Sequence, residues 1–361
     1  MVIGKIEMYK RMKKIIEYKI ILLLIISLAI LYNKKVVAQE GNTKVGTTAA
    51  NFLQLEIGAR AIGLGGAYVA LSNDATGLFW NSAGIGLVDN GNAVYQFGSR
   101  YADITHHYVG LVYSLGSDDK IGVMVNYVDI GDMEITTLND PDGTGQYFSA
   151  SDLALGLSYA RQLTDHVYVG VIFKYIQENI WMETASGFAI DMGAIYKIEE
   201  SGISVGMNLA NLGPDMSIND APNLEFYKEK VEGYPGSPTP KSVYATKTFP
   251  LPLVFSMGFA MNFIGRNTIV LPSSAHELML SISANDSFDA PFRGNVGLEY
   301  TWQNTLSFRS GYHIGYDTKD LSLGFGLNLK SFTTLDITLD YVWNNYGDLG
   351  AINVFSLGMN F

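Results

Sequence analysis

The sequence predicts an all-β protein: a closed transmembrane antiparallel β-barrel of about 14 strands, with an N-terminal hatch segment inside its lumen. Three observations lead to this fold class. From residue 92 onward, apolar residues alternate with polar or small ones, the period of a β-strand with two different faces. After residue 38, no apolar run reaches the length of about eighteen residues that a membrane helix needs. Only 16% of the 361 residues are charged, and the 38 glycines and 22 tyrosines argue against a helical soluble enzyme.

Residues 1–38 are predicted to form a secretory signal peptide. A basic start precedes an apolar run from Ile20 to Leu31, and Val36-Val37-Ala38 offers a small-residue cleavage site. The intervening Asn33-Lys34-Lys35 leaves the cleavage site open, and Met8 or Met12 is an alternative start. A single membrane anchor is the other interpretation, but the apolar run is short for a bilayer.

The charge of the chain excludes one large class of partners. Cleavage after residue 38 leaves 16 Lys and Arg against 33 Asp and Glu, a net charge of -17. Nucleic-acid binding needs a basic surface that displaces counterions, so no nucleic-acid partner is expected. The chain has no cysteine, which excludes disulfides, cysteine nucleophiles and Cys-containing zinc sites.

Residues 39–91 form the predicted hatch segment. The run Gly63-Leu64-Gly65-Gly66 allows tight turns and close backbone packing, and Leu53, Leu55 and Phe79 offer apolar anchors. A compact segment of this kind ahead of a barrel is expected to fold inside the lumen. The predicted hatch motif consists of Gly58, Ala59, Arg60, Gly63, Gly65, Gly66, Asp74, Trp80, Asn81, Ser82, Ala83 and Gly84.

Residues 92–361 form the predicted transmembrane barrel. From Asp152 to Tyr159, for example, leucine or tyrosine alternates with alanine, glycine or serine. In lipid every backbone group has to be paired, so an even number of strands about ten residues long fits a closed barrel. A large soluble sandwich or propeller is the alternative, but a sandwich does not place small residues so persistently opposite its apolar face. The fourteen segments are centred near residues 95, 110, 125, 156, 170, 191, 206, 258, 281, 297, 310, 325, 338 and 356.

The predicted connections alternate in length. Short ones such as Leu163–His166 and Gln303–Thr305 alternate with longer ones such as Gly131–Ala150, as expected for short periplasmic turns and long external loops. The segment at about residues 213–250 holds six of the ten prolines and lacks strand periodicity, so it is predicted to be a long external loop. Residues 266–276 are an exception, a longer stretch on the predicted periplasmic side.

The chain ends in a predicted assembly signal. Phe355, Leu357, Met359 and the terminal Phe361 alternate with small or polar residues. A lipid-facing last strand that closes on an aromatic residue resembles the signal recognised by the outer-membrane assembly machinery. That machinery and outer-membrane lipid are therefore expected partners, whereas an ordinary edge strand is the alternative interpretation.

Several ionisable residues fall on the inward parity. Glu299 and Arg309 lie on the small-residue faces of neighbouring strands, and a three-residue turn at Gln303–Thr305 places them directly opposite each other. We predict an ion pair there, with a structural role favoured over a transport role. Arg60 of the hatch is expected to reach a luminal carboxylate. The predicted luminal ionisable residues are Lys174, Asp191, Glu299, Arg309, His313, Asp336 and Asp340.

No motif predicts a catalytic or metal site. The run Gly63–Gly66 lacks the Lys-Ser/Thr ending of a P-loop. His106 and His107 are adjacent strand residues, so they point to opposite faces and cannot chelate one ion together. No nucleophile motif marks a lipase site. We therefore expect no enzyme activity, no cofactor and no metal.

The hatch and the closing strands resemble the PorV/PorQ branch of the FadL-like outer-membrane proteins, from Asn51 to Phe361. Ser82 occupies a position where the family usually has proline, and around Asp74 and Ser82 the chain resembles the general branch rather than PorV itself. The resemblance implies a fourteen-stranded barrel with an N-terminal hatch. The matching stretches are Gly58-Ala59-Arg60-Ala61, Gly63-Leu64-Gly65-Gly66-Ala67, Trp80-Asn81-Ser82-Ala83-Gly84, Asn295–Tyr300, Phe308–Tyr312 and Leu323–Leu327.

The same resemblance implies a bacterial outer-membrane location. Better-known members belong to the type IX secretion system of Bacteroidota-like bacteria, where PorV associates with the translocon and carries cargo. We therefore expect a non-enzymatic, type IX secretion-associated barrel whose partners are secretion components or cargo. The alternative is a FadL-like channel for small hydrophobic molecules. A continuous apolar pocket would favour uptake, whereas a plugged polar lumen beneath an exposed apolar loop surface would favour partner binding.

Overall fold

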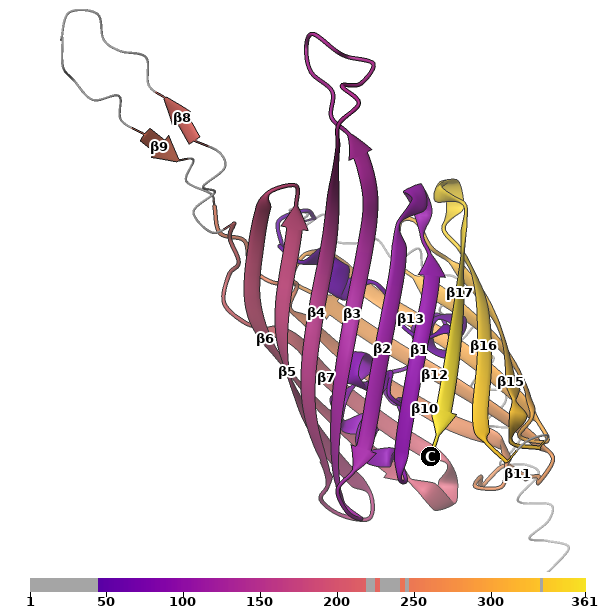
Figure 1. Ribbon diagram of the computed structural model, residues 1–361. Coiled ribbons are helices and arrows are strands. Elements are labelled where there is room, and N and C mark those ends of the chain that lie inside the picture. Colours follow the sequence, from indigo (N-terminus) through magenta and orange to yellow (C-terminus); the bar gives the residue numbers. More distant parts are fainter. Residues whose placement is uncertain (1–44, 219–224, 228–240, 244–246, 332–333) are drawn as a thin grey trace, which may run out of the picture. The chain divides into compact units, whose positions relative to one another are not determined.

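Long antiparallel strands frame the protein in the computed structural model, which describes residues 45–218, 225–227, 241–243, 247–331 and 334–361 (Figure 1). The predicted signal peptide, residues 1–38, and the first part of the predicted hatch lie outside the described residues. None of the helices in these ranges is long and apolar enough to cross a membrane.

Fourteen strands of the described chain form one closed sheet. Each pairs with its neighbour in sequence, and the sheet closes where β1 pairs with β17 and β7 pairs with β10. All fourteen predicted strand centres lie within these strands, so the predicted antiparallel barrel is confirmed. The strands are β1 (Gly91–Ser99), β2 (Thr105–Ser114), β3 (Asp119–Glu134), β4 (Tyr147–Gln162), β5 (Val167–Ile180), β6 (Glu183–Ile198), β7 (Ile203–Leu212), β10 (Val254–Gly265), β12 (His276–Ser287), β13 (Ala290–Trp302), β14 (Leu306–Ile314), β15 (Leu321–Asn328), β16 (Asp336–Asn345) and β17 (Ala351–Asn360).

The two faces of the barrel wall differ as the alternation predicts. On β4, Leu155, Leu157 and Tyr159 point outward and are exposed, whereas Ala154, Gly156, Ser158 and Ala160 point inward and are buried. The outward face therefore suits hydrocarbon, and the barrel leaves no open edge that would expose unpaired backbone groups to lipid.

The two ends of the barrel differ in their connections. One end has turns such as 163–166, 199–202 and 303–305, and we assign it to the periplasm because such barrels have short periplasmic turns. The longer stretch at 266–275 lies at that end and contributes β11 (Leu271–Pro272), which pairs parallel with β10. The long connection at the other end contains β8 (Glu225–Tyr227) and β9 (Lys241–Val243), which pair with each other; parts of this predicted external loop lie outside the described residues.

One predicted connection is shorter than expected. The segment Gly131–Ala150 was predicted as loop, but β3 continues to Glu134 and β4 starts at Tyr147. The two strands pair along this extension, from Gly131 opposite Ala150 to Glu134 opposite Tyr147, after a bulge at Asp129 to Gly131. Backbone pairing thus overrides a stretch of weak apolar periodicity. In Figure 1 this pair of strands rises beyond its neighbours; we call residues 129–152 the β3–β4 arm.

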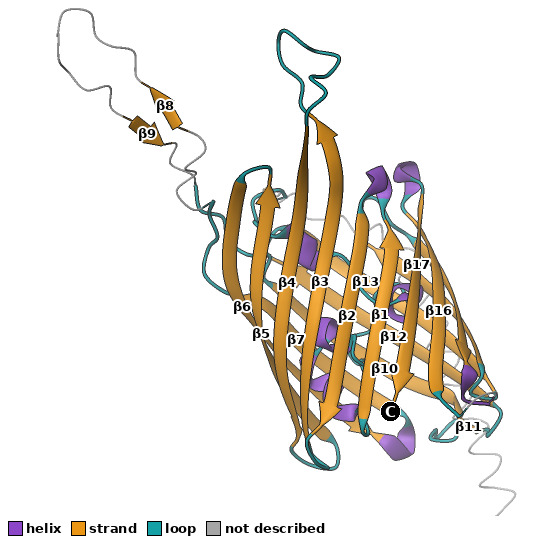
Figure 2. Ribbon diagram, viewed as in Figure 1, coloured by secondary structure: helices purple, strands orange, loops and turns teal. Residues whose placement is uncertain are grey.

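The described part of the predicted hatch segment, residues 45–90, which we call the hatch, runs against the inward faces of the strands (Figure 2). It contains four short helices. Inward glycines let its backbone approach: a Cβ on Gly311 of β14 would lie 2.0 Å from the backbone nitrogen of Gly65. The hatch helices are η1 (Asn51–Gln54), α2 (Ala59–Gly63), α3 (Gly77–Trp80) and η2 (Ser82–Leu87), and the connections hold η3 (Tyr101–Asp103), η4 (Glu199–Ser201), η5 (Leu329–Ser331) and η6 (Gly347–Leu349).

Candidate functional site

Luminal side chains supply hydrogen-bond partners to the hatch backbone. This backbone forms no sheet ladder, so its buried peptide groups need other partners. The peptide nitrogen of Ala75 donates to Asn92 Oδ1 at 2.7 Å, and its carbonyl accepts from the Tyr108 hydroxyl at 2.7 Å. The hatch is therefore held by many polar contacts and not by apolar packing alone. Further bonds of this kind join Gly58 to Gln96, Ala59 to Ser356 and Ala70 to Ser204.

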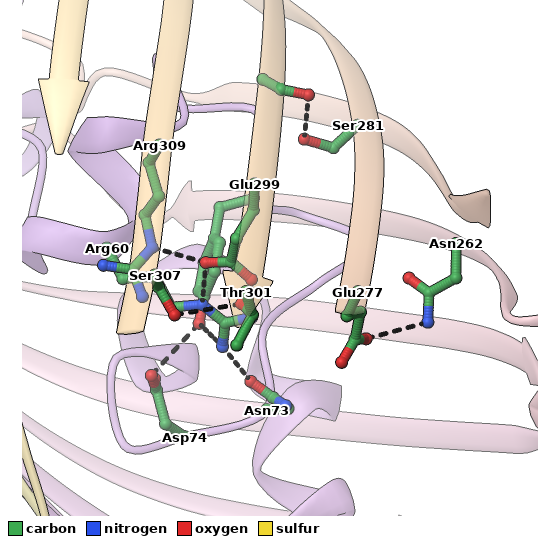
Figure 3. Close-up of polar contacts among 12 residues, drawn as sticks. Arg60, Asn73, Asp74, Asn262, Glu277, Ser281, Glu299, Thr301, Ser307 and Arg309 are labelled. Carbon is green, nitrogen blue, oxygen red and sulfur yellow. Dashed lines mark hydrogen bonds and ion pairs between the residues drawn. The ribbon is translucent and has the colours of Figure 1, made fainter. Parts of the chain in front are cut away.

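Four charged side chains of alternating sign connect the hatch to the barrel, and Figure 3 shows three of them, Arg60, Glu299 and Arg309. Arg60 of α2 makes two bonds with Glu299 of β13, Nε to Oε2 at 3.0 Å and Nη2 to Oε1 at 2.8 Å. Arg309 of β14 donates from Nε to Glu299 at 2.5 Å and from Nη1 to Asp340 of β16 at 2.6 Å. The register places Glu299 opposite Arg309, so the predicted ion pair is confirmed. Two cations and two carboxylates leave this network with no net charge.

A second group of hatch residues positions Arg60. Its Nη1 donates to Asn73 Oδ1 at 2.9 Å, and the Tyr68 ring lies 5.6 Å from the guanidinium carbon. The Tyr68 hydroxyl in turn donates to Asp74 Oδ2 at 3.1 Å (Figure 3). The motif residue Asp74 therefore acts within the hatch, where it fixes the side chain that supports Arg60.

A second ion cluster lies at the external end of the lumen, and of its three members only His313 is among the predicted luminal residues. Lys319, in the β14–β15 connection, lies 2.7 Å from Glu56 Oε1, and His313 Nε2 lies 3.3 Å from the same oxygen. Burial alone would raise the pKa of Glu56, but the neighbouring Lys319 and His313 outweigh it and hold that pKa well below its ordinary value. Glu56 sits in an apolar stretch of hatch, and only the folded topology brings these partners to it.

Lys174 and Asp191 form a third buried pair. Lys174 Nζ of β5 lies 2.8 Å from Asp191 Oδ2 of β6 and also donates to Asn211 of β7. The β6–β7 register shifts at Asp191, and the peptide nitrogen of Asn211 donates to Asp191 Oδ1 at 2.7 Å. The Asp191 carboxylate thus accepts the hydrogen bond that the Asn211 nitrogen cannot make to the ladder at this register shift, and it also pairs with the buried Lys174.

The stretch Trp80-Asn81-Ser82-Ala83-Gly84 has a structural explanation. Trp80 Nε1 donates to the Ile57 carbonyl at 2.8 Å, which ties two parts of the hatch together. Asn81 caps η2 by accepting from the Ala83 nitrogen at 3.2 Å, and it donates to the Val69 carbonyl at 2.9 Å. A Cβ on Gly84 would lie 2.3 Å from the Ser72 carbonyl oxygen, so a larger residue cannot fit.

The remaining residues singled out from the sequence lie apart from these clusters. Asp336 is at the periplasmic end, with its Oδ2 2.7 Å from Lys330 Nζ. The Phe361 nitrogen donates to the Gly91 carbonyl at 3.1 Å, beside the seam where β1 meets β17. His106 is buried against Asn126, whereas His107 stacks on outward-facing aromatic rings, as their opposite parity predicts. No group of three metal-binding side chains occurs in the described part of the chain.

Cavities lie at both ends of the described lumen. The external cavity has a volume of about 250 Å³ and is lined by residues such as Glu56, Lys174 and Trp80. At the periplasmic end, two cavities of about 890 Å³ and about 250 Å³ share Leu87, Lys197 and Glu199. Within the described ranges, neither shares a lining residue with the external cavity.

The outer end of the β5–β6 hairpin is apolar although it lies beyond the lipid-facing band. We place the outer edge of that band at the aromatic rings of Phe173, Phe188 and Tyr175, because aromatic girdles flank the apolar band of such barrels. Above Tyr175 the outward face is polar, because Gln177, Asn179 and Thr184 form a hydrogen-bonded ladder. The hairpin then turns at Trp181, which is 58% exposed. Six residues at about 3.3 Å each, on a strand tilted by about 40°, place Trp181 roughly 15 Å above Tyr175.

We call Tyr147, Ile180 and Trp181 the apolar tip. Ile180 and Tyr147 are 52% and 61% exposed, and the Trp181 nitrogen donates to the Ser149 carbonyl of β4 at 3.0 Å. Trp181 has a φ of 55°, a left-handed conformation that costs a bulky residue about 1–2 kcal/mol. The β3–β4 arm beside it is acidic: residues 121–160 hold six Asp and Glu and no Lys, Arg or His. The tip is therefore an exposed apolar surface beside an acidic segment of the barrel wall.

A closed fourteen-stranded barrel with an apolar outer wall and a polar interior defines an outer-membrane β-barrel protein. Solved structures of the same fold include the Ralstonia pickettii toluene transporter TbuX, with a TM-score of 0.54 and 13% identity over 84% of this chain and 98% of that one. The P. putida toluene transporter TodX has a TM-score of 0.53 and 12% identity over 84% and 98%. The CymD monoaromatic hydrocarbon channel has a TM-score of 0.52 and 12% identity over 84% and 96%. At such identities the likeness concerns the fold.

The family follows from the sequence. Residues 38–232 match the family model described as type IX secretion system protein PorV, and the matched range includes Asp74 and Ser82. This chain belongs to the PorV family. No protein of curated function matches it in sequence.

Proposed function

We propose that this barrel is a non-enzymatic component associated with type IX secretion, which works through protein contacts at its external face. The observation that carries the proposal is the apolar tip. Trp181 is exposed above a polar ladder, and it occupies a left-handed position of a two-residue hairpin turn where glycine or asparagine is usual. Aromatic residues of this kind are the ones that dominate protein–protein binding energies.

The charge around the tip defines the kind of partner surface that it fits. Asp132 and Glu134 of β3 pair in register with Ser149 and Tyr147, next to the tip. A partner with an apolar pocket and a basic rim would bury Trp181 and neutralise the acidic arm at once. Secretion components or cargo exposed at the outer face are candidates for such a partner.

The lumen also supports a scaffold. The hatch backbone is hydrogen-bonded to the wall, and the Arg60–Glu299 pair bridges the hatch to β13. The external cavity is lined by charged and polar residues together with apolar ones such as Leu53, Leu55 and Phe79, and within the described residues it shares no lining residue with either periplasmic cavity. A plugged polar lumen beneath an exposed apolar surface is the arrangement expected of a partner-binding barrel.

The proposal is tested by affinity purification of the tagged barrel from native outer membranes, for wild type and Trp181→Ala. Type IX components should co-purify with wild type. Loss of a central aromatic anchor costs about 2 kcal/mol or more, so recovery of the partner should fall by about 30-fold at limiting concentration. Phe292→Ala is the matched control, because Phe292 is 66% exposed on β13, away from the tip.

A FadL-like channel for small hydrophobic molecules is the second candidate. The solved structures of like fold are described as toluene transporters and a hydrocarbon channel, which favours this reading. Recovery of the barrel alone with bound lipid, together with hydrocarbon uptake by whole cells that express it, would support the channel and count against the scaffold.

We also propose the roles of the two ends of the chain. Residues 1–38 would be removed as a signal peptide, and residues 39–91 would act as the hatch. Phe361 would be read by the assembly machinery, since it closes the last strand beside the seam with β1. Truncation of Phe361 should lower the amount of folded barrel in the outer membrane without changing synthesis.

A further inference from the structure

The cavity at the external end of the lumen carries an unbalanced positive charge. Five charged side chains line it: Glu56, Lys174, Asp191, Arg293 and Lys319. Both carboxylates are used in ion pairs, Lys174 with Asp191 at 2.8 Å and Lys319 with Glu56 at 2.7 Å. Among the described residues, Arg293 has no carboxylate partner, and its Nε is buried without a hydrogen bond. The Arg293 side chain is only partly exposed, and a guanidinium without a carboxylate partner on the cavity wall favours an anion at this end of the cavity.

Two of the cationic side chains share one aromatic neighbour. The guanidinium carbon of Arg293 and the ammonium nitrogen of Lys319 each lie 4.5 Å from the centre of the Tyr316 ring. Lys319 pairs with Glu56, whereas Arg293 has no carboxylate partner among the described residues. A planar guanidinium with free donors suits a carboxylate or a phosphate.

A row of polar side chains leads away from Arg293 along the cavity wall. The register places Asn208 of β7 opposite Ser256 of β10, Ser256 opposite Asn285 of β12, and Asn285 opposite Arg293 of β13. All four line the cavity. Asn208 is 4% exposed, and its Oδ1 has no partner within the described structure. This buried acceptor calls for a donor such as a hydroxyl group.

We propose that the cavity binds a small hydroxylated organic anion of the sugar-acid type, with its anionic group at Arg293 and its hydroxyls along Asn208, Ser256 and Asn285. The volume of about 250 Å³ lies below the roughly 300–1,000 Å³ of sites for drug-sized ligands, so the molecule is small. The polar row disfavours a long acyl chain. Trp80 and Phe79 of the hatch provide aromatic faces on which a sugar ring can pack.

The test is isothermal titration calorimetry of the full barrel, purified in detergent, with three probes: glucuronate, glucose and decanoate. Glucuronate should bind, glucose at least about tenfold more weakly, and decanoate should show no binding in the cavity. Arg293→Gln should weaken glucuronate binding at least about tenfold, and Asn208→Ala should weaken it about threefold or more. Arg161→Gln, an outward side chain that is 52% exposed, is the matched control and should bind as wild type does.

Folding of each variant is checked by its resistance to unfolding in SDS without heating. If Arg293→Gln does not fold, Asn208→Ala carries the test. Absence of glucuronate binding at 10 mM overturns the proposal, and so does equal binding by wild type and a folded Arg293→Gln. Tighter binding of decanoate than of glucuronate also overturns it. The inference goes beyond the proposed secretion role, because co-purification of partners does not depend on glucuronate binding.

Discussion

The charge network between hatch and barrel gives the sharpest prediction about stability. In Glu299→Gln, a neutral amide replaces one of the two carboxylates in the network, while both arginines remain. The network therefore becomes net positive. The Glu299 side chain is 9% exposed and accepts three bonds from Arg60 and Arg309. Breaking one partner out of a buried ion pair costs about 3–5 kcal/mol. Arg309 keeps Asp340, so we expect the lower end, about 3 kcal/mol.

A second substitution separates charge balance from packing. Arg60 is 25% exposed, so Arg60→Gln alone should cost only about 1–2 kcal/mol. In the Glu299→Gln background, Arg60→Gln restores neutrality, because Arg309 and Asp340 still pair. In that background, Arg60→Gln should cost less than about 0.5 kcal/mol of unfolding free energy. The two substitutions are therefore expected to be coupled by roughly 1 kcal/mol.

The assay is urea-induced unfolding of each variant in phospholipid vesicles, followed by tryptophan fluorescence. Protease sensitivity of the hatch, read in parallel, reports whether the segment leaves the lumen. Two results would refute the idea that this network holds the hatch. One is that the free-energy changes of the two substitutions simply add, and the other is that Glu299→Gln lowers the unfolding free energy by less than about 1 kcal/mol.

Three further predictions follow from the hatch and the tip. Gly311→Ala should expel or distort the hatch and raise its protease sensitivity, because the new Cβ meets hatch backbone, whereas Gly294→Ala, with its nearest atom at 3.8 Å, should behave as wild type. Folding lowers the pKa of Glu56, so its contribution to the unfolding free energy is fully present above about pH 4.3, the pKa of glutamate in the unfolded chain, and is lost as the pH falls below that value. The gap in unfolding free energy between wild type and Glu56→Gln should therefore shrink by about 1.4 kcal/mol per pH unit under pH 4, and a constant gap would contradict the assignment. Trp181→Gly should stabilise the barrel by about 1 kcal/mol by relieving the left-handed turn, yet abolish partner recovery; unchanged recovery would remove the tip from the binding surface.

The barrel could be predicted because its strands obey local rules. Alternation in sequence fixes which face meets lipid, and a short turn fixes the register of its two strands. The pairing of Glu299 with Arg309 followed from these two facts alone, and the structure has it. The extent of β3 and β4 was missed, because the outer part of the β3–β4 arm has no apolar face to reveal it.

The contacts of the hatch could not be predicted in the same way. Glu56 meets Lys319 across more than 260 residues of sequence, and no periodicity links a loop residue to a hatch residue. The row from Asn208 to Arg293 depends on the registers of four strands and on a bulge near Asn285, so a shift at one strand would break it. Trp181 was overlooked because one exposed aromatic residue in a turn carries no pattern.

The proposed role of this barrel in type IX secretion can be tested by measuring secretion directly. The gene for this chain would be deleted in its native host and replaced by wild type, Trp181→Ala or Phe292→Ala, with barrel levels matched. The amount of type IX cargo at the cell surface and in the medium is then quantified. We expect cargo release to fall on deletion, to return with wild type and Phe292→Ala, and to stay low with Trp181→Ala. Undiminished cargo release in the deletion strain, with a loss of hydrocarbon uptake instead, would contradict it.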